Sequence, residues 1–330
     1  MSRLRLVGGL ALSAALVAYL LWTVDLGQVA RELRRADPGW TALGAGLAVA
    51  GLWVRARRWR YLFPPGSDPP GLVPAVMIGY MVNNVLPLRA GELVRVYVVG
   101  RRWAGRFWTA LGTLVVERVL DSLAIVFVLG VLALLIPVPA LFRWTALTVL
   151  AVDLVAVTAL AVMAGAPERS RRLLAGLLAR WPAAAGRVTR ALETFMAGLE
   201  GIRDPRHAVP LVLWTALVWL VPALAAWVVL RALGLGASFT AGWTVLAFVG
   251  LGVSIPSAPG YVGVFHYAAV LAVEIFGVPR PTAVSYALLF HATQYIPVTL
   301  VGWIVLLREH VSLAEATHRP EIAGARPPSS

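Results

Sequence analysis

Apolar runs of about twenty residues recur along the whole chain and set its pattern. Runs such as 6–22 and 208–230 approach the roughly 20 apolar residues with which a helix spans a bilayer. The alternation typical of membrane-barrel strands is not sustained anywhere. The pattern predicts an all-α polytopic membrane protein, with apolar segments at about 6–24, 39–62, 72–88, 107–136, 141–163, 207–233, 238–256, 259–277 and 281–307.

Two of these segments are interrupted by polar residues and helix breakers. The first reads NNVLPLRAGELVRVY over residues 83–97, and the second reads SIPSAPGYVGVFHY over residues 254–267. Proline removes a backbone donor and clashes with the preceding turn, while glycine permits a positive φ. We therefore expect two helices broken at membrane depth, although simple proline kinks are the alternative. The expected helix-breaking residues are Pro87, Gly91, Pro256, Pro259, Gly260 and Gly263.

The distribution of arginine predicts how the segments cross the membrane. The connection 166–206 carries eight arginines, which places it in the cytoplasm by the positive-inside rule. A full crossing by 72–88 would leave five arginines outside, whereas a re-entrant segment over about 72–105 keeps them inside. A second re-entrant segment over about 238–277 would enter from the opposite side. Broken segments in corresponding positions of two halves are typical of inverted repeats with a binding site between them.

The same pattern divides the chain into four parts. The connection 166–206 has helical periodicity, with Trp181 and Phe195 among its apolar residues, which favours amphipathic helices lying in the membrane interface. A solvated connector is the alternative. The predicted division is a first membrane half at 1–165, a cytoplasmic interfacial connector at 166–206, a second membrane half at 207–310 and a flexible cytoplasmic tail at 311–330.

Composition agrees with a membrane protein and narrows its partners. The 330 residues are 59% hydrophobic and only 14% charged, with a mean hydropathy of +0.79. Cysteine is absent, which excludes disulfides and thiolate metal sites. The net charge of +13 comes from arginines that lie between apolar segments, so anionic lipid headgroups explain it better than nucleic acid. Neither a cofactor nor a metal site is expected.

Ionisable and amide side chains around the first break are the candidate ligand-binding residues. Charges within a membrane span are costly, so they normally pair or line a cavity. The candidates for a lipid headgroup are Asn83, Asn84, Arg89, Glu92, Arg95, Glu117, Arg118 and Asp121, with Ser257, His266 and Gln294 as weaker ones. The alternative is a purely structural ion pair, either Arg118 with Glu92 or Arg89 with Glu117.

With these residues the chain resembles the lysylphosphatidylglycerol synthase transmembrane region, a flippase-like family, over roughly residues 5–308. The match rests on Asn84, Leu86-Pro87, Arg89, Gly91-Glu92 and Arg95, then on Glu117-Arg118 and Asp121, then on Pro256, Pro259-Gly260 and Gly263. Two positions depart from the family pattern: Tyr261 stands where many members have glycine, and His266 where they have glutamate.

The resemblance implies a translocase that moves an anionic or modified phospholipid, or a lipid-linked sugar, between leaflets. We expect no enzymatic activity, because the aminoacyl-transferase domain of the best-known relatives does not follow the last span. No nucleotide-binding P-loop is present. A membrane glycosyltransferase using a lipid-linked donor, or a non-transporting partner of a separate lipid-modifying synthase, are the alternatives. The expected location is the cell membrane, with both termini in the cytoplasm.

Overall fold

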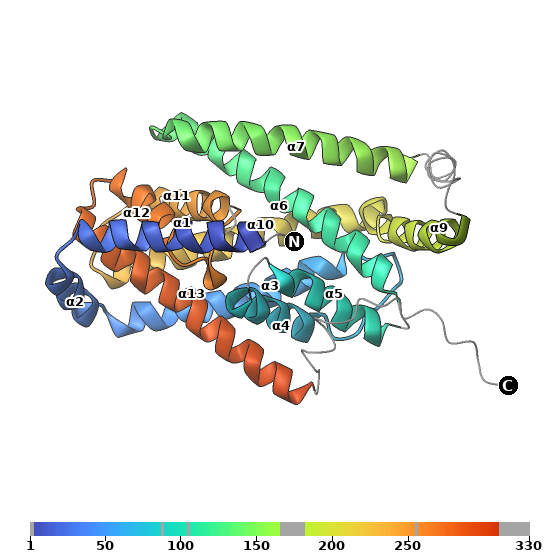
Figure 1. The fold of residues 1–330 in the computed structure, drawn as a ribbon, viewed down its shortest axis with the longest axis horizontal. Helices are drawn as coiled ribbons and strands as arrows, with labels where there is room; N and C mark the ends of the chain where they lie inside the picture. The colour runs from blue at the N-terminus through green and yellow to red at the C-terminus, as the bar shows by residue number, and fades with distance from the viewer. Residues whose placement is uncertain (1–2, 87–88, 104–105, 166–181, 255–256, 310–330) are drawn as a thin grey trace.

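The computed structural model describes residues 3–86, 89–103, 106–165, 182–254 and 257–309, and this part of the chain is helical, without a strand (Figure 1). The all-α prediction is therefore confirmed. The predicted tail 311–330 lies outside the described residues. The elements are α1 (Arg3–Trp22), α2 (Leu26–Arg35), α3 (Pro38–Arg60), α4 (Leu72–Val85), α5 (Ala90–Arg102), α6 (Phe107–Leu135), α7 (Ala140–Gly165), α9 (Pro182–Ala197), η1 (Glu200–Ile202), α10 (Pro205–Ala232), α11 (Phe239–Gly252), η2 (Pro259–Tyr261), α12 (Val264–Glu274) and α13 (Arg280–Arg308).

Long apolar helices make this a multi-pass membrane protein. Among the described residues α6, α7, α10 and α13 are long and apolar enough to cross a bilayer, and α1 with α2 forms a further candidate bent by 88°. Helix α2 was not predicted from the sequence. It forms because Asp25 caps its first turn by accepting a hydrogen bond from Gly27 N at 2.7 Å, and Asp37 caps α3 in the same way.

Four shorter helices surround the two predicted breaks. Helices α4 and α11 have 14 residues each, while α5 has 13 and α12 has 11. At 1.5 Å per residue even the longest extends only about 21 Å, less than the roughly 30 Å of bilayer hydrocarbon. Each half thus contains a hairpin of two helices that are individually too short to cross. The re-entrant orientation and the inverted repeat stay predictions.

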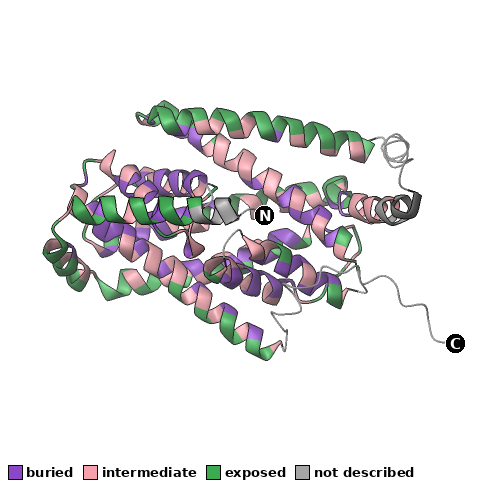
Figure 2. Ribbon diagram, viewed as in Figure 1, coloured by how far each residue is buried: buried purple, intermediate pink, exposed green. Residues whose placement is uncertain are grey.

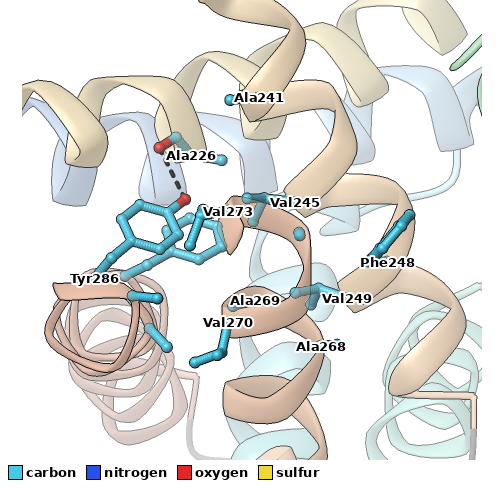
Figure 3. Packing of buried hydrophobic residues seen from close by; sticks show 14 of the residues in the cluster. Ala226, Ala241, Val245, Phe248, Val249, Ala268, Ala269, Val270, Val273 and Tyr286 are labelled. Atoms are coloured by element: carbon cyan, nitrogen blue, oxygen red, sulfur yellow. Dashed lines mark hydrogen bonds between the residues drawn. The ribbon is translucent and has the colours of Figure 1, made fainter. Parts of the chain in front are cut away.

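Buried side chains form two main clusters. One gathers α3, α4, α5 and the first part of α6, and the other gathers α10, α11, α12 and the first part of α13. In the second cluster, which also holds Val270 and Val273, Tyr286 is fully buried and its hydroxyl donates to the carbonyl of Ala226 at 3.0 Å (Figure 3). The later part of α13 contributes Val298 to the first cluster, so this helix joins the two.

The outer helices differ in how much they are covered. Helix α7 and most of α1 are exposed along their length, as expected of helices that face lipid (Figure 2). Helix α9, by contrast, packs on α6, where the hydroxyl of Thr109 donates to the carbonyl of Thr194 at 3.1 Å. Phe195 packs against the first cluster, although the sequence placed its face in lipid. Residues 166–181 of the predicted connector lie outside the described part.

Candidate functional site

The first break separates α4 from α5. Leu86 is extended, with φ −103° and ψ 146°, and Arg89 adopts a left-handed conformation with φ 55°. The predicted helix break is confirmed here, but Pro87 itself lies outside the described residues. The carboxamide oxygen of Asn83 accepts a hydrogen bond from Gly91 N at 2.9 Å and so ties the two helices together.

Gly91 does not break the helix, and this prediction is wrong. The residue lies within α5, and the left-handed position belongs to Arg89. Gly91 is needed for a different reason: a Cβ there would lie 1.8 Å from the carbonyl oxygen of Gly79 on α4. Close packing of the two short helices therefore requires glycine at this position.

Gly91→Ala is expected to destabilise the first hairpin by about 1–3 kcal/mol, because an added methyl group has to push α4 and α5 apart. The measurement is the melting temperature of the purified protein in detergent. Gly46→Ala is the matched control, since a Cβ at Gly46 meets nothing within 4 Å. Equal melting temperatures for both variants would contradict the close packing of α4 on α5.

The second break lies between α11 and α12. Pro259 begins the short turn η2, and positive φ values follow at Gly260 (68°), Tyr261 (59°) and Gly263 (88°). The break is confirmed at these residues, while Pro256 lies outside the described part. Glycine adopts such angles at little cost, whereas a positive φ is uncommon for a residue with a Cβ such as Tyr261. Helix α1 braces the turn, because Ser13 Oγ accepts from Ala258 N at 2.9 Å.

The two breaks contact each other directly. An Arg89 guanidinium nitrogen donates to the carbonyl of Val253, just after α11, at 3.0 Å. The carboxamide of Asn84 donates to Thr299 Oγ1 on α13 at 2.9 Å, and a ring nitrogen of His291 lies 2.8 Å from the carbonyl oxygen of Gly260. Segments about 170 residues apart in the sequence thus share one polar region, as matching broken helices would.

A cluster of buried charges lies beside the first break. Arg58 of α3 is fully buried and reaches Asp121 at 2.5 Å and Glu117 at 3.1 Å, both on α6. Arg95 of α5 reaches Glu117 at 3.0 Å and lies over the ring of Trp59 at 4.8 Å. These contacts lock α3, α5 and α6 together, and they hold Arg95 away from any open surface.

The outer edge of the cluster is partly exposed. Arg118 bridges all three carboxylates, with Glu92 at 3.4 Å, Glu117 at 3.0 Å and Asp121 at 2.9 Å. The Arg118–Glu92 pair, which the sequence left open as an alternative to ligand binding, is therefore present. Arg89 contacts Glu92 at 3.8 Å. The other alternative from the sequence, a pair of Arg89 with Glu117, is not among the ion pairs of the described residues.

An apolar cavity of about 260 Å³ adjoins this cluster and lies between the two halves. Arg55 joins cavity and cluster, because it lines the cavity, lies 3.9 Å from Asp121 and stacks at 5.4 Å over the ring of Tyr80. The wall is otherwise mostly aliphatic and aromatic, and it includes the polar side chains of Asn84, His291, Gln294 and Tyr295.

The weaker candidates lie near the second break. Gln294 lines the cavity, and its buried Nε2 has no hydrogen-bond partner among the described residues. The buried hydroxyl of Ser257 is likewise without a partner in that part of the chain. His266 is buried, and its Nδ1 accepts from the backbone of Gly263 at 3.3 Å, which makes it a cap of α12.

Arg55 and Arg58 were missed as site residues in the sequence. They belong to a run of four arginines at the end of α3, which the charge rule explains by orientation alone. Their spacing carried a signal, since residues three apart share a helix face. That face is turned toward α6, whereas Arg57 and Arg60 are exposed.

Comparison with known proteins gives one family match and two distant relatives. The family model described as Lysylphosphatidylglycerol synthase TM region matches residues 6–302. The chain is 28% identical over 303 residues to "Glycosyltransferase AglD" of Haloferax volcanii, covering 81% of this chain and 48% of that protein, so it spans about half that relative's length. It is 23% identical over 269 residues to "UPF0104 membrane protein" of Methanothermobacter thermautotrophicus, covering 75% of this chain and 78% of that protein. No solved structure matches the chain.

Proposed function

Because the chain belongs to the family of the lysylphosphatidylglycerol synthase transmembrane region, we propose that it translocates lipids with anionic headgroups between the leaflets of the cell membrane. The observation that carries this proposal is the meeting of two broken helices beside an arginine-rich cluster and an apolar cavity. A lipid has a polar headgroup, which suits the arginine-rich cluster, and a hydrocarbon chain, which suits the apolar cavity.

The proposed division of labour follows from burial. Arg58 and Arg95 hold Glu117 in the interior and act as a scaffold. Arg95, a headgroup candidate from the sequence, is therefore not proposed as a headgroup ligand. Arg89 and Arg118 are partly exposed and would bind the headgroup, since a guanidinium binds phosphate with paired donors.

Movement is proposed to start at the contact between the breaks. Arg89 donates to the carbonyl of Val253, and an arriving phosphate would compete for the same donor. Losing that bond would separate the two hairpins on one side and open a path for the headgroup. We also propose that both termini lie in the cytoplasm, that anionic lipid binds at the connector and that a separate lipid-modifying synthase is a candidate partner.

The test is leaflet transfer of fluorescent phosphatidic acid and phosphatidylglycerol in proteoliposomes. Wild-type protein should raise the transfer rate above that of protein-free vesicles. Arg89→Gln should lower the protein-dependent rate at least about tenfold, the loss expected for one charge-assisted hydrogen bond. Arg60→Gln is the control, because Arg60 pairs with Asp68 at an exposed position. Undiminished transfer by Arg89→Gln would contradict the site, and no transfer by the wild type would contradict the function.

A glycosyltransferase-type activity is the second candidate, favoured by the name of the relative from Haloferax volcanii. The chain matches only about half of that protein, so the name extends to this chain only as a hypothesis. An enzyme would form product from a lipid-linked sugar donor in detergent, where leaflets no longer exist. A translocase would form none there.

A further inference from the structure

The charges around the first break do not balance. Five arginines contact three carboxylates among the described residues, which leaves an excess of two positive charges: Arg55, Arg58, Arg89, Arg95 and Arg118 against Glu92, Glu117 and Asp121. Uncompensated charge is costly within a membrane protein. The excess therefore favours binding of an anion that carries more than one negative charge.

Distances identify the two arginines that are only loosely paired with a carboxylate. The buried Arg58 reaches carboxylate oxygens at 2.5 and 3.1 Å, within hydrogen-bond distance. Arg55 lies 3.9 Å from Asp121 and Arg89 lies 3.8 Å from Glu92, both too far for a hydrogen bond. Their side chains are also 20% and 36% exposed. The spare positive charge is thus carried by Arg55 and Arg89.

Both arginines adjoin the same cavity. Arg55 is part of its wall together with the aromatic rings of Tyr80 and Tyr261. The guanidinium of Arg89 lies 6.0 Å from the centre of the Tyr261 ring. The cavity itself is small, since about 260 Å³ falls below the roughly 300–1,000 Å³ of pockets that enclose a whole ligand. It has room for part of one hydrocarbon chain.

We infer that Arg55 joins Arg89 and Arg118, the headgroup arginines proposed above, in binding a phosphate monoester or diphosphate, with the adjoining part of the lipid chain in the cavity. This inference rests on the proposed lipid translocation and names its substrate class. A phosphate monoester carries about −1.5 to −2 charges at pH 7, which matches the excess of two positive charges. A phosphodiester supplies only one negative charge. An aminoacylated phospholipid supplies no net negative charge, because its ammonium groups equal or outnumber its single phosphate charge.

The test is equilibrium binding to the protein in neutral phosphatidylcholine nanodiscs, with three probes that share the same acyl chains. Phosphatidic acid is the monoester, phosphatidylglycerol the diester and lysyl-phosphatidylglycerol the aminoacylated lipid. Phosphatidic acid should bind at least about tenfold more tightly than the other two, as a second phosphate contact implies. Equal affinity for phosphatidylglycerol or lysyl-phosphatidylglycerol would overturn the inference.

Variants assign the effect to the two arginines. Arg55→Met and Arg89→Met should each remove most of the preference for phosphatidic acid, while Arg55→Lys, which keeps the charge, should retain it. Arg57→Met is the matched control, because Arg57 is an exposed arginine of the same helix. Melting temperatures identify variants that fail to fold. An equal loss in Arg57→Met, or loss of the preference in folded Arg55→Lys, would overturn the assignment.

Two further measurements distinguish a lipid phosphate from free phosphate, and the headgroup inference from the proposed translocation. Inorganic phosphate at millimolar concentration should not displace phosphatidic acid if the ligand is a lipid, and full displacement would overturn the lipid part. Binding does not require transfer. Selective binding of phosphatidic acid without leaflet transfer would therefore contradict the proposed function and support the headgroup class. Leaflet transfer without selective binding would support the proposed function and contradict the headgroup class.

Discussion

Arg58→Met is expected to destabilise the protein by about 3–5 kcal/mol, the cost of removing one partner from a buried ion pair. Arg58 is fully buried and lies 2.5 Å from Asp121 and 3.1 Å from Glu117. Methionine fills much of the same volume but leaves both carboxylates with fewer partners. The measurement is unfolding of the purified protein in detergent, followed by circular dichroism during a denaturant titration.

Two comparisons make the Arg58 prediction specific. Arg57→Met removes an exposed arginine from the same helix and should change the unfolding free energy by less than about 0.5 kcal/mol. The double variant Arg58→Met, Asp121→Asn should be less destabilised than the sum of its single variants, since groups in contact are not additive. Additive losses would show that Arg58 and Asp121 do not stabilise each other.

The sequence predicted the helices and their breaks because these depend on local chemistry. Runs of apolar residues set the long helices, and proline with glycine marks where the short ones end. Helix α2 was missed because its ten residues are too short and too polar for a membrane span, and its start is set by the Asp25 cap. Sequence patterns thus predict helices that are defined by hydropathy, and they miss a helix such as α2 whose start depends on one capping hydrogen bond.

The pairing of charges could not be predicted to the same degree. Which arginine meets which carboxylate depends on how α3, α5 and α6 rotate against one another, and the sequence carries no direct measure of that rotation. Arg58 and Glu117 are 59 positions apart, yet their side chains are 3.1 Å apart. Gly91 shows the same limit, because its role depends on the carbonyl of Gly79 across the hairpin and not on its own φ.

Arg118→Lys is expected to reduce the protein-dependent rate of leaflet transfer about a hundredfold while the protein stays folded. Arg118 lies within 3.4 Å of Glu92, 3.0 Å of Glu117 and 2.9 Å of Asp121, and it keeps a partly exposed edge beside Arg89. A lysine keeps the charge but presents its donors at one point, so it cannot hold the carboxylates and also offer paired donors to a headgroup phosphate. Losing the paired hydrogen bonds to the headgroup phosphate corresponds to about a hundredfold in rate.

The fold should tolerate this change because Glu117 still has Arg58 and Arg95 as buried partners. Transfer of fluorescent phosphatidic acid and the melting temperature are measured on the same preparation. Arg60→Lys is the control, since an exposed pair such as Arg60 with Asp68 contributes at most about 1 kcal/mol. Unchanged transfer in Arg118→Lys would show that charge alone matters at this position. A lowered melting temperature with proportionate loss of transfer would instead assign Arg118 to the scaffold, leaving Arg55 and Arg89 as the arginines that meet the headgroup.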